Sequence, residues 1–192
     1  MEELGLTPFV APGTRPSGDL LPRLKRFRFE LLADYVAARF DPCRVADVGG
    51  GKGLLAWLLQ ERGFRASVID PVAQPLPGKY KSLALDKRVR IAPDASVPRV
   101  DAAFEASHGS DFDLLVGLHA HGSNVAMLEA AADFGCNVLL LPCCVIDEPL
   151  TPVAGRSWFY CLTDRAEALG LGLEYFHLNF KGQNVGFIAG RG

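Results

Sequence analysis

A glycine-rich segment, Asp47-Val48-Gly49-Gly50-Gly51-Lys52-Gly53, most constrains what this chain can fold into. It completes the apolar run from Val45 to Val48 and precedes a helix-like segment from Leu54 to Arg62. Glycines at positions 49, 51 and 53 let the backbone turn tightly and let a ligand approach where a side chain would clash. The helix that follows offers unpaired N–H groups and a partial positive charge, which suit a carboxylate or phosphate. The segment therefore predicts a strand–turn–helix unit that approaches a ligand.

Short apolar runs alternate with helix-length segments through the rest of the chain. After the first strand we predict strands at Ala66 to Ile69, Arg88 to Ile91, Asp113 to Gly117, Asn137 to Leu141, Leu173 to Leu178 and Asn184 to Ala189. The other predicted helices are Leu20 to Phe40, Val97 to Ala106, Asn124 to Phe134 and Arg156 to Leu169. This alternation implies a mostly parallel sheet covered on both faces. The predicted fold is α/β, with a doubly wound, mostly parallel seven-stranded sheet and a C-terminal antiparallel hairpin.

The domain organisation follows from length and from the proline content of the first residues. Residues 1–18 contain three prolines and show no periodicity, which indicates an extended N-terminal arm. Residues 19–192 have the length of one compact domain, and the helix from Leu20 belongs to it.

Charge and cysteine usage bound the partners and the compartment. The net charge of −2 excludes a chain that is basic throughout, so contact with RNA would need a local patch of cations. Such a stretch runs from Arg15 to Arg28, and Arg23, Lys25 and Arg26 are its candidate RNA-binding residues; a solvated helix face is the alternative. The acidic N-terminus lacks the layout of a signal peptide, and no apolar run approaches the ~20 residues of a membrane span. Five irregularly spaced cysteines favour reduced thiols, so we expect a cytoplasmic protein without a membrane partner.

The spacing of the glycines separates the classes of nucleotide loop. A dinucleotide loop, G-x-G-x-x-G, would place its third glycine at position 54, which is leucine. A Walker A loop is excluded because Gly53, and not Ser or Thr, follows Lys52. The spacing G-x-G-x-G after a strand that carries Asp47 resembles the cofactor motif of class I S-adenosylmethionine-dependent methyltransferases. The alternative is an ordinary glycine-rich turn between strand and helix.

This resemblance implies S-adenosylmethionine as the cofactor and assigns its binding residues. Asp47, Gly49, Gly51 and Gly53 would lie near the methionine part, and Gly117 would lie in the strand that leads to the same crevice. Asp70 ends the second strand, where a carboxylate can accept both ribose hydroxyls, although a turn residue before Pro71 would look the same. Asp94, just past the third predicted strand, would lie near the adenine.

Two further motifs narrow the resemblance to one branch of these enzymes. The fourth predicted strand leads into Leu118-His119-Ala120-His121-Gly122, and the fifth leads into Pro142-Cys143-Cys144. A Leu-His-x-x-Gly motif with a later Cys-Cys pair is similar to the branch that includes the tRNA acceptor-stem ribose methyltransferases. The resemblance implies an RNA acceptor, with His121 as a substrate-binding residue.

His119 is the candidate catalytic residue, because imidazole titrates near neutral pH and can accept the proton of an attacking nucleophile. Equally, His119 could only hydrogen-bond a backbone carbonyl or the cofactor, since positioning dominates in many methyl transfers and no strong base is needed. A metal site built from His119, His121, Cys143 and Cys144 has suitable ligand types for zinc. Adjacent cysteines are awkward for one tetrahedral centre, however, so we predict packing at a strand end and no metal.

The predicted function is methyl transfer from S-adenosylmethionine, with RNA as the acceptor. Alternatives are a protein or small-molecule acceptor, and a non-catalytic nucleotide-binding or scaffold protein of the same fold. An NAD-dependent oxidoreductase is disfavoured by Leu54.

Overall fold

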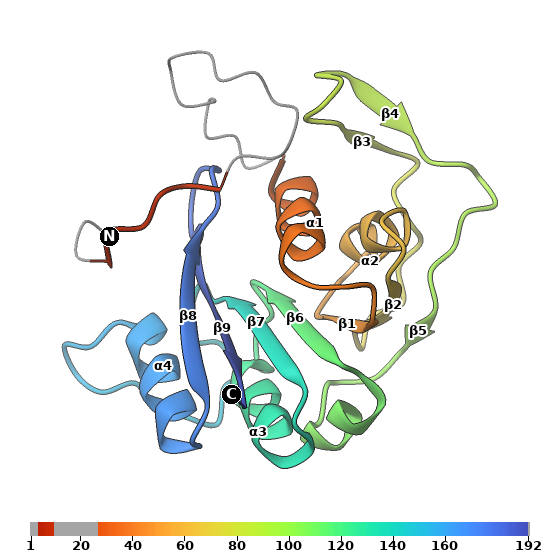
Figure 1. Cartoon of the computed structure of the whole chain (residues 1–192). Helices are drawn as coiled ribbons and strands as arrows, with labels where there is room; N and C mark the ends of the chain where they lie inside the picture. The colour runs from red at the N-terminus through yellow and green to blue at the C-terminus, as the bar shows by residue number, and fades with distance from the viewer. Residues whose placement is uncertain (1–3, 10–26, 192) are drawn as a thin grey trace.

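The structure is a computed structural model, and it describes residues 4–9 and 27–191. Among these residues, seven strands form one large sheet in the order β5-β2-β1-β6-β7-β9-β8 (Figure 1). The strands are β1 (Arg44–Val48), β2 (Arg65–Ile69), β5 (Arg99–Val100), β6 (Leu114–Leu118), β7 (Asn137–Leu141), β8 (Gly172–His177) and β9 (Val185–Gly190). The first five along the chain pair in parallel, whereas β9 is antiparallel to both β7 and β8. This confirms the predicted α/β fold and its terminal antiparallel pair.

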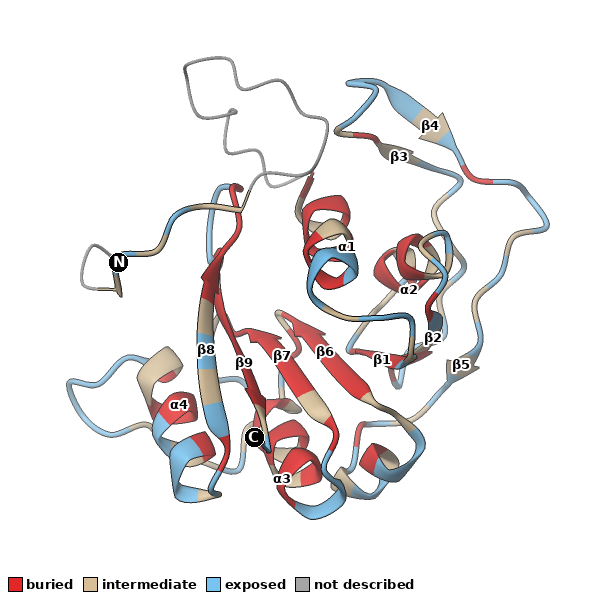
Figure 2. Cartoon of the chain, viewed as in Figure 1, coloured by how far each residue is buried: buried red, intermediate tan, exposed pale blue. Residues whose placement is uncertain are grey.

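Helices cover both faces of the large sheet (Figure 1). Helices α1 (Arg28–Arg39) and α2 (Leu54–Gln60) lie on one face, and α3 (Asn124–Phe134), α4 (Trp158–Ala168) and the 3₁₀ helix η3 (Ala106–Asp111) lie on the other. Each face has its own apolar core, and the central strands are buried on both sides (Figure 2). This double burial explains why strands such as β7 are almost entirely apolar. No helix among the described residues is long and apolar enough to cross a membrane.

Helix α1 forms because its apolar side chains repeat at helical spacing and face the sheet. Leu31, Leu32 and Val36 are buried, and Tyr35 stacks on Phe176 of β8 with ring centroids 4.4 Å apart. The prediction of a helix here is confirmed over residues 28–39, and its first seven positions lie outside the described residues. Of the predicted arm, residues 4–9 are described, and the backbone N–H of Phe9 donates to the carbonyl of His177 at 2.7 Å.

Two sequence-based assignments between β2 and β6 were wrong. The predicted third strand, β4 (Arg88–Arg90), is not in the large sheet but pairs antiparallel with β3 (Lys79–Lys81) in a separate two-stranded sheet. Only Val89 among its three residues is apolar, which is too little for a strand buried on both faces.

The predicted helix from Val97 to Ala106 instead contains β5, the true third strand of the large sheet. Pro98 holds the residue before it in extended geometry, which opposes a helix here. The carbonyls of Pro98 and Val100 then accept hydrogen bonds from Val68 and Asp70 at the end of β2.

The strand order reverses between β1 and β6. From β1 the chain adds β2 and β5 on one side, then returns to add β6 and β7 on the other. In doubly wound sheets the ligand crevice lies at this reversal, outside the carboxyl ends of the strands. A ligand site is therefore expected in the segments that follow β1, β2 and β6.

Candidate functional site

The glycine turn follows β1 and has the backbone geometry that only glycine adopts without strain. Gly49, Gly51 and Gly53 have φ of +65°, +53° and +75°. The turn is also crowded, because a Cβ at Gly49 would lie 3.2 Å from the Cβ of Ala120 in the loop after β6. Gly53 precedes the first residue of α2, so the turn delivers the chain directly to a helix N-terminus.

The side chain of Asp47 contacts the glycine turn and the helix that follows it. Its side chain is buried, and Oδ2 accepts a hydrogen bond from the backbone N–H of Ala56 at 3.2 Å. Burial raises the pKa of Asp47 to about 7, while the hydrogen bond from Ala56 lowers it and the nearby charge of Asp70 raises it by a smaller amount. A Cβ at Gly50 would lie 2.5 Å from the Asp47 carboxyl carbon, so Gly50 is needed for close packing. Sequence reasoning had not singled out Gly50, although its place between two turn glycines was a signal.

Asp70 and Arg99 hold the turn from its outer side. The two oxygens of Asp70 accept hydrogen bonds at 2.8 Å from the backbone N–H groups of Gly51 and Val72. The Arg99 guanidinium donates to the carbonyls of the same two residues, at 2.8 and 3.0 Å. Arg99 was missed because its segment was predicted to be a helix. Each carboxylate oxygen has two acceptor sites, so Asp70 keeps capacity for further donors.

Two pockets meet at this turn. The first, of about 430 Å³, is lined by Asp47, Gly49 to Lys52, Leu54, Arg28, Phe29, Gln74, Pro77, Leu118 and His119. The second, of about 490 Å³, is lined on its polar side by Asp70, His119, His121, Ser123 and Asp147, and it also includes Gly49 and Phe104. Gly49 and His119 line both pockets. The arrangement can therefore hold one elongated ligand along the turn and a second molecule beside it.

Three predicted cofactor residues do not line these two pockets. Gly53 lines neither pocket, and a Cβ there would lie 2.8 Å from Cγ2 of Val97. Gly117 lies inside β6, where a Cβ would lie 2.7 Å from the Leu140 side chain, so its small size serves packing. Asp94 is exposed and follows β4, so the reason for choosing it, a position after a strand of the large sheet, was wrong. The residue directly after β5 is Asp101.

His119 lies at the end of β6 in an unusual backbone conformation, with φ of +60°. Such strain in a non-glycine residue costs of order 1–3 kcal/mol and is concentrated at functional sites. Its Nε2 lies 3.0 Å from the carbonyl oxygen of Gln183, between β8 and β9, and its backbone N–H donates to Leu141. One hydrogen bond thus holds the imidazole and another holds the backbone of His119, which lines both pockets.

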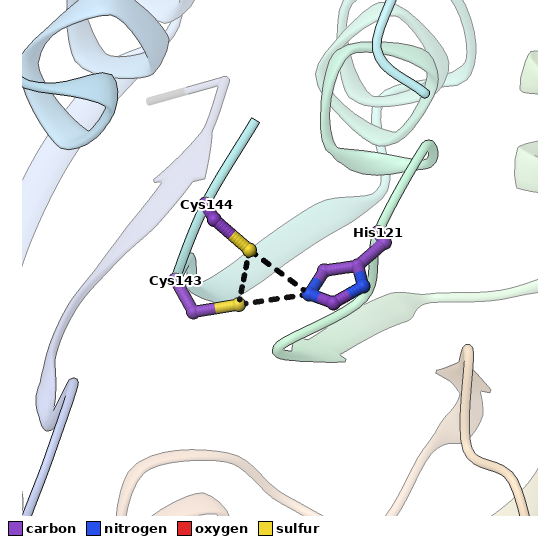
Figure 3. Close-up of side chains that lie close together, drawn as sticks. All are labelled: His121, Cys143 and Cys144. Carbon is purple, nitrogen blue, oxygen red and sulfur yellow. Dashed lines mark hydrogen bonds between the residues drawn. The ribbon is translucent and has the colours of Figure 1, made fainter. Parts of the chain in front are cut away.

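The side chains of His121, Cys143 and Cys144 come together in the loops that follow β6 and β7 (Figure 3). The Nε2 atom of His121 lies 3.0 Å from Sγ of Cys143 and 3.2 Å from Sγ of Cys144, and the two sulfurs are 3.3 Å apart. Burial raises the pKa of the Cys143 thiol to about 11, and the hydrogen bond with Cys144 raises it too. With no added cation, Cys143 is therefore a neutral thiol near pH 7 and a poor nucleophile.

The loops that carry these three side chains are tied together. One oxygen of Glu148 accepts from the backbone N–H of Asn124 at 2.9 Å, and the other accepts from that of Val125 at 3.2 Å. The side-chain amide of Asn124 donates to the same carboxylate and to the carbonyl of Ala120. Glu148 therefore caps the N-terminus of α3.

Of the predicted RNA-binding residues, Arg23, Lys25 and Arg26 lie outside the described residues. Arg28, at the start of α1, lines the first pocket, and burial lowers the pKa of its guanidinium. Its guanidinium carbon lies 4.8 Å from the ring centroid of Phe29.

The β3–β4 hairpin adds a cationic surface that sequence reasoning missed. Lys79 faces Arg90 across the two strands, and Lys81, which also pairs with Asp86, faces Arg88. Tyr80 points to the opposite side of the hairpin and packs on Trp57 of α2 with ring centroids 5.6 Å apart. A pocket of about 400 Å³ is lined by Tyr80 as well as by Lys79, Lys81 and Arg88, and it shares Phe29, Leu54 and Pro77 with the first pocket. The hairpin therefore extends the cleft with positive charge.

Comparison with solved structures identifies the fold. A 1,6-didemethyltoxoflavin-N1-methyltransferase from Burkholderia thailandensis, solved with 1,6-didemethyltoxoflavin and S-adenosylhomocysteine, superposes with a TM-score of 0.52. The match covers 87% of this chain and 79% of that enzyme at 15% sequence identity. This chain has a methyltransferase fold.

Comparison with curated sequences adds one partial relative, and no family model matches the chain. A Caenorhabditis elegans protein described as "Probable tRNA (uracil-O(2)-)-methyltransferase" is 31% identical over 103 residues. The match covers 54% of this chain and 17% of that protein, so the chain matches about a sixth of the relative's length.

Proposed function

We propose that this chain binds S-adenosylmethionine at the glycine turn and transfers its methyl group to RNA. The observation that carries the proposal is the turn from Gly49 to Gly53, with its positive φ values, beside Asp70 at the reversal of strand order. A nucleoside with a charged amino-acid tail suits such a site, because the turn allows close backbone approach and a helix begins there.

In this proposal the first pocket takes the methionine part along Gly49 and Gly51, and Asp70 accepts the ribose hydroxyls. Asp47 then acts indirectly, because its carboxyl packs against Gly50 of the turn. The adenine would lie beyond Asp70, on the side from which Phe104 lines the second pocket. Asp94 was the sequence-based choice for the adenine, and Asp101 is the better placed carboxylate because it directly follows β5.

S-adenosylmethionine supplies a methyl group already activated on a positively charged sulfur. The protein's part is therefore alignment of the acceptor and exclusion of water. His119 is held by the Gln183 carbonyl at the junction of both pockets, where it orients the attacking hydroxyl and accepts its proton. On transfer, the acceptor oxygen would gain the methyl group as His119 takes up its proton, and S-adenosylhomocysteine would be the by-product.

RNA is favoured as the acceptor by the cations of the β3–β4 hairpin and by the partial likeness to a tRNA methyltransferase. Like charges directly opposite each other weaken a strand pair. Lys79 opposite Arg90 is therefore unfavourable for the hairpin alone and becomes favourable when phosphates lie between the cations. Arg28 and the shared wall of Phe29 and Pro77 connect this surface to the first pocket.

The first experiment measures cofactor choice by calorimetric titration with S-adenosylmethionine, S-adenosylhomocysteine and NAD. We expect binding of the two sulfur compounds and none of NAD. Purified chain is then incubated with labelled cofactor and with the RNA, protein and metabolite fractions of a lysate, and label is expected in RNA. Label in protein or metabolites alone would overturn the RNA acceptor while leaving the cofactor assignment intact. Tight cofactor binding with no transfer to any fraction would favour a scaffold.

A second experiment tests the RNA surface. Each Arg or Lys that contacts a phosphate contributes roughly one unit to the slope of log K against log salt concentration. We expect the Arg90→Ala variant to weaken tRNA binding and to lower this slope by about one unit. Arg65→Ala, which removes an exposed cation at the start of β2, is the control. Equal salt slopes for both variants would remove the hairpin from the proposal; Arg23, Lys25 and Arg26 can be tested in the same assay.

A further inference from the structure

We propose that His121, Cys143 and Cys144 form a zinc-binding site with a fourth position left for an exchangeable ligand. The three residues each offer one ligand atom, and these atoms all lie within 4.8 Å of one another. Thiolate sulfur and imidazole nitrogen are the donors that Zn²⁺ prefers in proteins. This inference is independent of the proposed methyl transfer, because it rests on the side chains that follow β6 and β7 alone (Figure 3).

The spacing of the ligand atoms fits one tetrahedral ion. Zn–S and Zn–N bonds of about 2.3 and 2.0–2.1 Å place tetrahedral ligand atoms roughly 3.6–3.8 Å apart. The present separations of 3.0, 3.2 and 3.3 Å need to widen by only about half an ångström, which side-chain rotation can supply. The two sulfurs and the nitrogen already face a common point (Figure 3).

In the sequence, the adjacency of the two cysteines argued against a metal site. In the structure, the backbone brings both of their side chains to one side. In an extended strand, neighbouring side chains point to opposite faces. Here β7 ends at Leu141, and after Pro142 both thiols point toward His121. Packing alone does not explain this convergence, because both cysteines are only half-buried and the imidazole that they meet is exposed.

The site is also held in place before any ion binds. Glu148 joins the loop after β7 to the start of α3, and Asn124 ties the loop after β6 to the same carboxylate. At Gly122, beside His121, a Cβ would lie 3.2 Å from the carbonyl oxygen of Asp147, so the two loops are in close contact. Ligands fixed on packed loops lose less conformational entropy on binding an ion.

Three protein ligands with one open position is the arrangement of catalytic rather than structural zinc sites. Binding replaces the two thiol protons with one Zn²⁺, which leaves the ion and its two thiolates without net charge and transfers no electrons. The fourth position then accepts water or an anionic or thiol group of a bound molecule, next to the pocket that His121 lines.

The test uses the full chain, reduced and free of metal, titrated with Co²⁺ as a spectroscopic substitute and then with Zn²⁺ in competition with a chromogenic chelator. We expect one equivalent of either ion, with thiolate-to-cobalt charge-transfer absorption and the strong visible bands of a tetrahedral centre. Zinc-edge X-ray absorption of the wild-type chain should show two sulfur neighbours and one imidazole. Added azide should shift the cobalt bands if the fourth position exchanges.

Matched variants assign the ligands. Cys143→Ser, Cys144→Ser and His121→Ala should each weaken Zn²⁺ binding at least 100-fold, whereas Cys43→Ser, which removes a half-buried thiol elsewhere, should leave it unchanged. Circular dichroism and thermal unfolding check that each variant is folded. The wild-type spectra test the metal site by themselves, so the test does not depend on the folding of any one variant.

Two results would overturn the proposal. One is a reduced wild-type chain that binds no Co²⁺ or Zn²⁺, or binds them without sulfur ligands. The other is a chain that forms a Cys143–Cys144 disulfide in air, seen as a mass lower by two hydrogens, and that takes up no metal after reduction. That result would make the two cysteines a redox couple. Cobalt bands that azide does not shift would contradict the exchangeable position.

Discussion

Asp47 makes a quantitative prediction about how stability depends on pH. The pKa of this buried carboxyl is about 7 in the folded chain and 3.8 in the unfolded one, so folding favours its neutral form. That stabilisation is complete below pH 3.8 and is lost progressively as the pH rises to about 7. At about 1.4 kcal/mol per pH unit, the loss amounts to about 4 kcal/mol. Asp47→Asn stays neutral and should not show this loss.

The assay is urea unfolding of the wild type and of Asp47→Asn, without cofactor, at intervals from pH 5 to pH 8. The free energy of unfolding of the variant should gain on that of the wild type by roughly 2 kcal/mol between pH 5 and pH 7, and the gain should level off just above pH 7. Asp113→Asn is the control, because hydrogen bonds from Arg44 lower the pKa of Asp113 to about 2, outside this window. Parallel curves for wild type and Asp47→Asn would refute the reasoning.

Three further predictions concern the turn, the histidine and the helix cap. Gly50→Ala should lower the affinity for S-adenosylmethionine at least tenfold by calorimetry, because its Cβ would meet the Asp47 carboxyl; Gly78→Ala, which faces open space, should not. His119→Gln should lower kcat by about a hundredfold and leave the cofactor Kd unchanged, and a change in both would indicate lost structure. Glu148→Gln should cost about 1 kcal/mol and lower Tm by about 2–4 °C, whereas Asp147→Asn should leave Tm in place.

The strands and the glycine turn were predictable because their signals are local. An apolar run such as Leu139 to Leu141 is too short and too apolar for anything except a buried strand, and only glycine adopts the φ of Gly49 and Gly51 cheaply. Asp70 could be placed for the same reason, since it directly follows such a run.

Features that depend on contacts between distant segments were not predictable. β5 has two residues and exists through its bonds to β2, so the site residue Arg99 was hidden in a segment interpreted as helix. The opposition of Lys79 to Arg90 needs a strand register that the sequence does not show. The convergence of His121 with the two thiols depends on how two loops pack, whereas their spacing in sequence argued against it.

The insertion of β9 between β7 and β8 has a consequence for how the protein is made. A ribosome releases β8 before β9, so β8 emerges with no partner and β7 keeps an open edge until residues 185–190 are synthesised. An open, apolar edge of this kind invites pairing with other chains. The carbonyl of Gln183 that holds His119 arrives at the same moment. A nascent or truncated chain therefore lacks both its protective strand and the carbonyl that holds His119, so the proposed methyl transfer would begin only after this aggregation-prone stage of folding has passed.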